Sequence, residues 1–323
     1  MVDERDEALY QAAQMYYLQN ETMEAIASTL GVSRSTVSRL LKAAREDGVV
    51  RISLAPHASR ISRLAVELRR LFDVDVHMVP ARRTHSDHQR LESVARVAAR
   101  RLEEWVQPDF TIGVAWGTTL AAVVTHLQPQ SIENVRVVQL NGAANSSTSG
   151  LPYASSIIVK VADTFDAKTV FFPVPAFFDY KATRDALWRE RSIKRVLTVQ
   201  QSCDIAVFGV GGLHGGATSH VYTAGYLDDD DMRQLEAQRV VGDICTVMLR
   251  EDGTFRDIEM NARATGPSPD ELKMIPRRVC IVSGAKKVPA ALGALRAGVA
   301  TDLIIDELTA SAMIKRATGR VPR

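Results

Sequence analysis

Apolar residues recur every three or four positions at the start of the chain, which is the period of amphipathic helices. The pattern predicts a first helix over residues 3–19, a second that Thr22 caps and a third that Ser33 caps. Gly31 lies between the second and third helices, where a residue with positive φ makes a tight turn. The N-terminal part is therefore expected to be a small all-α domain.

The Asp47-Gly48 pair ends the third predicted helix. Polar and apolar residues then alternate over residues 49–54, which predicts a short strand that would form a rudimentary wing. A hinge-like stretch follows. We therefore expect a DNA-binding domain over residues 1–55 and a larger domain over residues 56–323.

The second and third predicted helices resemble a bacterial helix-turn-helix. Small Ala27 allows the two helices to cross closely, and Gly31 and Val32 fit the turn and the residue after it. Arginine can pair bidentately with guanine, and hydroxyls can reach bases or phosphates. The predicted DNA-binding residues are Ser33, Arg34, Ser35, Thr36, Ser38, Arg39 and Lys42. The alternative is a three-helix protein-interaction module with a solvated basic face.

From residue 61 onward, helical periods alternate with short apolar runs, which is typical of an α/β fold with a mostly parallel sheet buried on both faces. Strands are expected at residues 74–79, 110–115, 135–140, 204–209, 243–249, 278–282 and 301–305. Helices are expected around residues 64–71, 91–105, 118–127, 153–164, 183–202, 229–240, 287–297 and 307–317, with a polar loop over 82–89.

Small polar residues occur at the ends of several predicted strands, where ligands of parallel sheets bind. The Gly117-Thr118-Thr119 stretch opens a helix and offers backbone N–H groups and hydroxyls to an anion, although a plain helix cap explains it equally well. Five such strand ends in one sheet favour a pocket for a polar, phosphorylated small molecule. The predicted effector-binding residues are Gly117, Thr118, Thr119, Asn141, Gly142, Asp204, Gly209, Asp243 and Lys287.

Composition narrows the class of protein further. The 323 residues suit two domains, and the net charge of +2 excludes a general polycation. Residues 31–45 nevertheless contain four basic residues and no acid, which suits a reader of short DNA sites. Three scattered cysteines and the absence of a signal peptide or a long apolar run predict a cytoplasmic protein that is not in a membrane.

No metal, cofactor or catalytic group is expected. His85 and His88 lack a third ligand nearby and are interpreted as solvated loop residues. The stretch 214–220, with a histidine at each end, is interpreted as a glycine-rich loop, although it could line the pocket. Residues 228–231 are interpreted as a helix start rather than a calcium loop.

Taken together, the predicted DNA-binding domain over residues 1–55 (the head) and five motifs resemble the SorC family of sugar-responsive bacterial regulators. The motifs are GVAWGTTL (113–120), PVPAFF (173–178), DIAVFGVGG (204–212), GDI (242–244) and the stretch from VSGAKK to SAMI (282–314). The resemblance implies an effector domain similar to ribose-phosphate isomerase and glucosamine-phosphate deaminase. It also implies a homodimer or homotetramer whose affinity for double-stranded operator DNA is set by a sugar or sugar phosphate.

Under this resemblance, residues 117–119 hold a phosphate, Lys287 faces a second charge or hydroxyl, and Asp243 bonds sugar hydroxyls. Ser283 departs from the family, which often has two adjacent glycines there, and the stretch after GDI has only Gly253. These departures leave the identity of the sugar open.

Two functions compete with a sugar-responsive transcription regulator. An isomerase or deaminase with an added DNA-binding head would need an acid–base pair over the sugar carbons. Asp204 and Asp243 are the pocket carboxylates expected from the sequence, and neither comes with a recognisable partner. A DNA-binding scaffold without a ligand is the other alternative.

Overall fold

The computed structural model describes residues 4–50, 60–145, 150–213 and 219–320. The chain divides into two compact units, Met1–His57 and Ala58–Arg323. The strand predicted over residues 49–54 is not present at Val49 and Val50, and the rest of it lies outside the described residues.

The smaller unit contains three helices, and the second and third have the predicted N-caps. The helices are α1 (Glu4–Tyr17), α2 (Met23–Leu30) and α3 (Arg34–Glu46). The Thr22 side chain accepts a hydrogen bond from the N–H of Ala25, and Ser33 caps α3 in the same way. Gly31 has φ 66° and ends α2. The three helices bury a small shared core of Ala12, Ile26, Val37 and Leu41.

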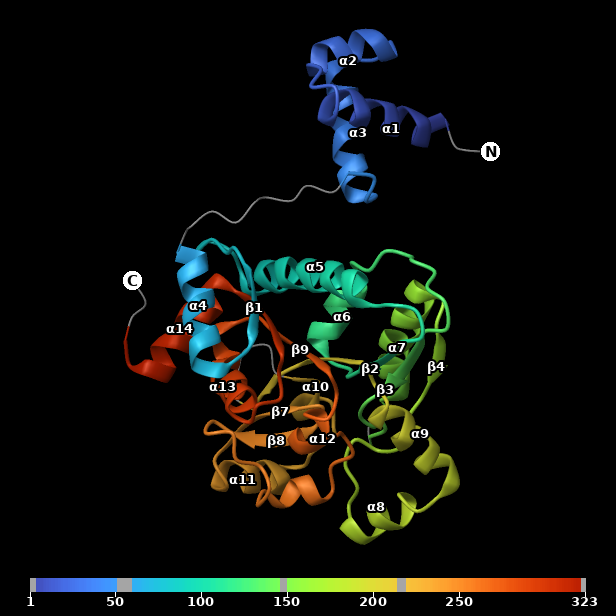
Figure 1. Ribbon diagram of the computed structural model, residues 1–323. Coiled ribbons are helices and arrows are strands. Elements are labelled where there is room, and N and C mark those ends of the chain that lie inside the picture. The colour runs from blue at the N-terminus through green and yellow to red at the C-terminus, as the bar shows by residue number, and fades with distance from the viewer. Residues whose placement is uncertain (1–3, 51–59, 146–149, 214–218, 321–323) are drawn as a thin grey trace. The chain divides into compact units, whose positions relative to one another are not determined.

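The larger unit is built on a seven-stranded sheet in which every strand pair is parallel (Figure 1). In spatial order, the strands are β1 (Asp75–Val79), β10 (Asp302–Asp306), β9 (Arg277–Val282), β5 (Ile205–Gly209), β2 (Thr111–Val114), β3 (Arg136–Gln139) and β4 (Lys168–Val170). The predicted α/β class is therefore confirmed. The short edge strand β4 was not predicted.

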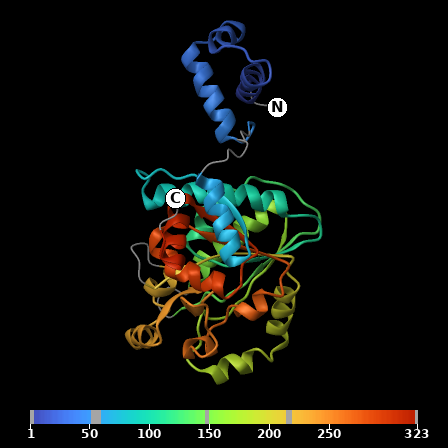
Figure 2. The same ribbon diagram turned by 60° about the vertical axis from the view of Figure 1, so that its left-hand side comes forward.

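Both faces of this sheet are buried (Figures 1 and 2). In β5, Ile205 and Val207 belong to one core, whereas Ala206 and Phe208 belong to the other. One core includes residues of α4 (Arg60–Phe72), α9 (Arg191–Gln201), α13 (Val288–Arg296) and α14 (Glu307–Thr318). The other includes residues of α5 (Asp87–Trp105), α6 (Thr118–Val124) and α7 (Leu151–Phe165). Because both faces are buried, strands such as β5 are continuous apolar runs and do not alternate between polar and apolar residues.

A small antiparallel sheet lies beside the carboxyl end of β5. Its strands are β6 (Gly211–Gly212), β7 (Val240–Ile244) and β8 (Val247–Arg250). The single strand predicted over residues 243–249 is therefore wrong. The chain reverses at Cys245 and Thr246, whose φ angles are 48° and 69°. Turns of this kind favour glycine, asparagine or aspartate, so cysteine and threonine at these positions do not predict the reversal.

Other boundaries also differ from prediction. The helix predicted over 183–202 is two helices, α8 (Lys181–Leu187) and α9, and the intervening Trp188 packs on Phe172 and Phe178. The predicted loop over 82–89 already contains the start of α5, where Ser86 and Gln89 form a capping box. The remaining helices are α10 (His220–Thr223), α11 (Asp229–Ala237), α12 (Pro269–Leu272), η1 (Glu259–Ala262) and η2 (Ala285–Lys287).

Replacement of Gly31 tests the turn of the head. No atom lies within 4 Å of a Cβ added there, so the cost of Gly31→Ala is conformational. We expect Gly31→Ala to destabilise the head by about 1 kcal/mol, and Gly31→Asn by less, because asparagine tolerates positive φ. Hydrogen exchange of amides in α2 and α3 measures this local stability. A loss above about 3 kcal/mol would mean that packing, not φ, selects glycine.

Candidate functional site

Each of the two units contains one candidate site. The first is the outer face of α3, where the predicted DNA-binding side chains gather. Ser33, Arg34, Ser35, Ser38, Arg39 and Lys42 are exposed, and Thr36 is partly buried. The opposite face of the helix is buried through Val37, Leu41 and Ala44. The amphipathic pattern thus fixes which side of α3 meets solvent.

Hydrogen bonds order the first turn of α3. The hydroxyl of Ser33 lies 2.7 Å from that of Ser35 and 2.9 Å from that of Thr36. Arg39 donates from Nη2 to the Thr36 hydroxyl at 3.2 Å. Hydroxyl and guanidinium groups therefore form one connected polar surface, which is the chemistry that base edges and phosphates recognise.

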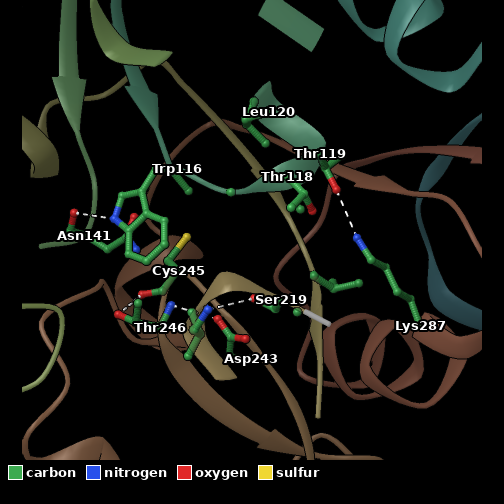
Figure 3. Close-up of a pocket in the computed structure, with 16 residues that line it drawn as sticks. Trp116, Thr118, Thr119, Leu120, Asn141, Ser219, Asp243, Cys245, Thr246 and Lys287 are labelled. Carbon is green, nitrogen blue, oxygen red and sulfur yellow. Dashed lines mark hydrogen bonds between the residues drawn. The ribbon is translucent and has the colours of Figure 1, made fainter. Parts of the chain in front are cut away.

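The second site is a small polar pocket in the larger unit (Figure 3). It lies at the carboxyl ends of β2, β3 and β5 and is closed by the small sheet and by residues around α10. The lining comprises residues 115–120, Asn141, residues 209–211, Ser219, Val221, Asp243, Cys245, Thr246 and Lys287. This is the sheet edge at which parallel α/β proteins bind ligands.

One end of the pocket is cationic. Gly117 precedes α6 and provides no side-chain cap, so the first N–H groups of the helix are left without a capping side chain. Lys287 donates from Nζ to the Thr119 hydroxyl at 3.1 Å, and Figure 3 shows this contact at the helix start. Burial lowers the pKa of Lys287, and the charge of Asp243 partly offsets that effect. The Cβ of Thr119 lies 3.1 Å from where a Cβ on Gly209 would be, so this approach requires a small residue in β5.

The other end of the pocket contains the carboxylate of Asp243, which is 5% exposed. Tyr222 donates its hydroxyl to Oδ1 at 3.0 Å, and the N–H of Thr246 donates to Oδ2 at 3.1 Å. Burial raises the pKa of Asp243 to about 6, although these hydrogen bonds and the charge of Lys287 act in the opposite direction. A Cβ on Gly211 would lie 2.0 Å from Oδ1, so β6 needs glycine there.

A third wall is aromatic and amide-rich. Trp116 donates from Nε1 to the carbonyl oxygens of Asn141 and Gly142 at 3.2 and 2.9 Å, and its ring stacks on Tyr226 with centroids 5.2 Å apart. Within the described residues, Oδ1 of Asn141 is buried without a hydrogen-bond donor. This wall thus combines a flat apolar surface with an unsatisfied acceptor, a combination that suits a ligand with hydroxyl groups.

The structure brings most of the predicted effector-binding residues together. Gly117, Thr118, Thr119, Asn141, Gly209, Asp243 and Lys287 line the pocket. Asp204 does not, because it precedes β5 at the opposite edge of the sheet and accepts a hydrogen bond from the N–H of Thr111 at 2.8 Å. Gly142 lies behind the wall, where an added Cβ would be 2.1 Å from the carbonyl oxygen of Pro175. Both positions therefore have structural roles.

Several lining or supporting residues were missed in the sequence. Trp116 lies inside the GVAWGTTL motif and could have been found there. Tyr222 and Thr246 carry no local signal, because only the fold brings them to Asp243. Among the described residues, no group of three His, Cys, Asp or Glu side chains is placed to hold a metal ion. In that same part of the chain, no helix is long and apolar enough to cross a membrane.

Comparisons with known proteins match both units. Residues 57–315 match the family described as "Putative sugar-binding domain", and residues 11–47 match "Sigma-70, region 4". The deoxyribonucleoside regulator of Bacillus subtilis (strain 168) is 29% identical over 96% of this chain and 98% of its own length. The sorbitol operon regulator of Klebsiella pneumoniae is 26% identical over 94% of this chain and 96% of its own length.

Solved structures give the same result. A domain of a possible sugar-binding transcriptional regulator from Arthrobacter aurescens TC1 is 44% identical, with a TM-score of 0.74 over 80% of this chain and 100% of that one. Full-length SorC of Klebsiella pneumoniae is 24% identical and shares the fold, with a TM-score of 0.78 over 98% of this chain and 100% of that one.

A helix-turn-helix unit followed by an α/β unit with a polar pocket defines a ligand-responsive transcription regulator. The chain belongs to the SorC family of sugar-binding transcriptional regulators.

Buried Asp243 makes a pH-dependent prediction. Because folding raises its pKa from 3.8 to about 6, the folded chain keeps a proton that the unfolded chain releases between about pH 4 and 6. This group therefore lowers stability as pH rises through that window. The free energy of unfolding of Asp243→Asn, relative to the wild type, should rise by about 2–3 kcal/mol from pH 4 to pH 7.

Urea unfolding of both proteins at several pH values measures this difference. Carboxyls with a lowered pKa, such as Asp302, act in the opposite direction, but they contribute equally to both proteins and cancel. A difference that does not change with pH would contradict the raised pKa of Asp243.

Proposed function

We propose that the pocket binds a phosphorylated sugar or polyol and that this effector controls the binding of operator DNA by α3. The observation that carries the proposal is that one pocket has hydrogen-bond donors and positive charge at one end and hydrogen-bond acceptors at the other. Lys287 and the start of α6 offer donors and positive charge, whereas Asp243 and Asn141 offer acceptors. A sugar phosphate has an anionic end for the first group and hydroxyls for the second.

The phosphate would lie against Gly117, Thr118 and Thr119, where backbone N–H groups and hydroxyls converge with Lys287. Its charge would replace the hydration that Lys287 loses on burial. Sugar hydroxyls would donate to Asp243 and to Oδ1 of Asn141, because both are acceptors in the buried lining. Relatives named as regulators of sorbitol and erythritol genes fit such an effector.

The pocket favours binding over catalysis. Within its described lining, Asp243 is the carboxylate, and both of its oxygens already accept hydrogen bonds from Tyr222 and Thr246. Among the described lining residues there is no histidine and no second carboxylate to complete an acid–base pair, and residues 214–218 lie outside the described residues. We therefore propose a regulator without enzymatic activity.

For DNA recognition, we propose that Ser33, Arg34, Ser35, Thr36, Ser38, Arg39 and Lys42 contact the operator. One such face is small, so regulation would depend on two or more heads in a homodimer or homotetramer that binds symmetric half-sites. The effector must then bind more tightly to one assembly state than to the other.

The effector proposal predicts selective binding of phosphorylated ligands. In a thermal-shift screen of sugars, polyols and their phosphates, a phosphorylated member should raise the melting temperature of the wild type. Lys287→Met should weaken its binding about tenfold or more, because a charge-assisted contact with the phosphate is lost. Lys286→Met is the matched control, since this neighbouring lysine is exposed and does not line the pocket. Stabilisation by an unphosphorylated sugar alone, with equal affinity in Lys287→Met, would rule out the phosphate site.

A separate prediction concerns the reading face, which is the outer face of α3 with the proposed DNA-binding residues. Arg39→Ala should reduce operator binding by about tenfold or more in a gel-shift assay, because it removes contacts to base edges or phosphates. Its thermal shift with the effector should equal that of the wild type. Arg96→Ala, which removes an exposed arginine from α5, should change neither measurement. Undiminished operator binding by Arg39→Ala would remove this residue from the reading face.

A further inference from the structure

An ion pair connects the two helices of the helix-turn-helix. Nε of Arg34, at the start of α3, lies 3.0 Å from Oε1 of Glu24 in the first turn of α2. Both side chains are largely exposed, at 66% and 62%. Glu24 is also the single acidic residue between Thr22 and Arg45, a stretch that otherwise carries four basic residues.

The geometry of this pair leaves the far end of the guanidinium available. Arginine has one donor on Nε and two on each Nη. Glu24 approaches Nε at 3.0 Å, and among the described residues Arg34 makes no hydrogen bond and no other ion pair. The two Nη groups form the edge that pairs with O6 and N7 of guanine. The carboxylate therefore restrains the side chain without occupying the edge that would read a base.

Stability does not account well for this pair. Exposed ion pairs contribute little, and an acid in the first turn of a helix adds only a few tenths of a kcal/mol through the helix dipole. Against that small gain, a carboxylate near the phosphates of bound DNA weakens binding by repulsion. An acid at this position is thus unfavourable for affinity unless it has a role in the bound complex.

We propose that Glu24 is a positioning residue that holds Arg34 in the conformation that reads guanine, so that it determines specificity at one base pair of the operator. The inference rests on the proposed reading face. Glu24 restricts the long arginine side chain before DNA arrives, which lowers the conformational entropy lost on binding. In the complex, water is excluded and the pair orients the guanidinium plane more strongly.

The test uses the full-length protein and DNA selected from a randomised duplex pool. Arg34→Ala first identifies the base pair whose guanine preference depends on Arg34. The preference is then measured as the ratio of Kd values for the selected site and for the site with that guanine replaced. We expect the wild type to prefer guanine by about tenfold or more and Glu24→Ala to lose most of that preference. Its affinity for random-sequence DNA should be unchanged or higher, because a negative charge is removed.

Glu46→Ala is the matched control. Glu46 lies 3.6 Å from Lys42 in a pair of similar exposure, 64% and 68%, in the same small unit. The substitution removes the same charge, so it should raise non-specific affinity similarly while it keeps the guanine preference. In an Arg34→Ala background, Glu24→Ala should have no further effect on that preference, because the residue acts through Arg34.

The outcomes separate two failures. If Arg34→Ala changes no base preference, the reading face and this inference are both overturned. If Arg34→Ala removes a guanine preference but Glu24→Ala keeps it, the inference alone is overturned. Equal losses in Glu24→Ala and Glu46→Ala would also overturn it, since charge and not position would then be responsible. Circular dichroism and melting curves of each variant establish that the head is folded.

Discussion

The pocket of the larger unit is organised around one buried carboxylate, that of Asp243. Asp243 lies at the end of β7, accepts hydrogen bonds from Tyr222 of α10 and from Thr246 of the β7–β8 turn, and shares a pocket with Lys287. A buried charge is tolerated only where such partners compensate for its lost hydration. Gly211 is needed for the same reason, because any side chain there would displace the carboxylate. The turn at Cys245 and Thr246, with two positive φ angles, is held by a hydrogen bond to Asp243 as well.

The pocket suits a ligand sensor because, without a ligand, its buried charged groups lack part of the stabilisation that water would give them. Burial raises the pKa of Asp243 and lowers that of Lys287, so both groups lose stabilisation in their charged forms. A ligand that donates hydroxyls to the first and presents an anion to the second recovers part of that loss. The ligand can change DNA binding only if this gain in free energy differs between two states of the protein. By linkage, operator DNA must then change effector affinity by the same factor.

How much the sequence could predict differs between features. The parallel strands were predictable because strands buried on both faces, such as β5 and β10, appear as uninterrupted apolar runs. The β7–β8 hairpin was not predictable, because Cys245 and Thr246 occupy turn positions where glycine or asparagine is usual. Asp204 was expected in the pocket because it adjoins a strand, but it adjoins the amino end of β5, whereas parallel sheets bind ligands at the carboxyl ends of their strands. Tyr222 was missed because its role comes from a contact across 21 positions of sequence.

In the head, by contrast, the local sequence pattern predicts the helices and their turn but not the contacts between side chains of different helices. The N-caps of α2 and α3 and the turn at Gly31 followed from residue type and spacing. The Glu24–Arg34 contact did not, because ten positions separate the residues and only the crossing of two helices brings them together. Affinity for DNA depends on the number of positive charges, which composition reveals. Specificity depends on how each donor is held, and that is a property of tertiary contacts. The one acid in a basic stretch is therefore more informative about recognition than the basic residues around it.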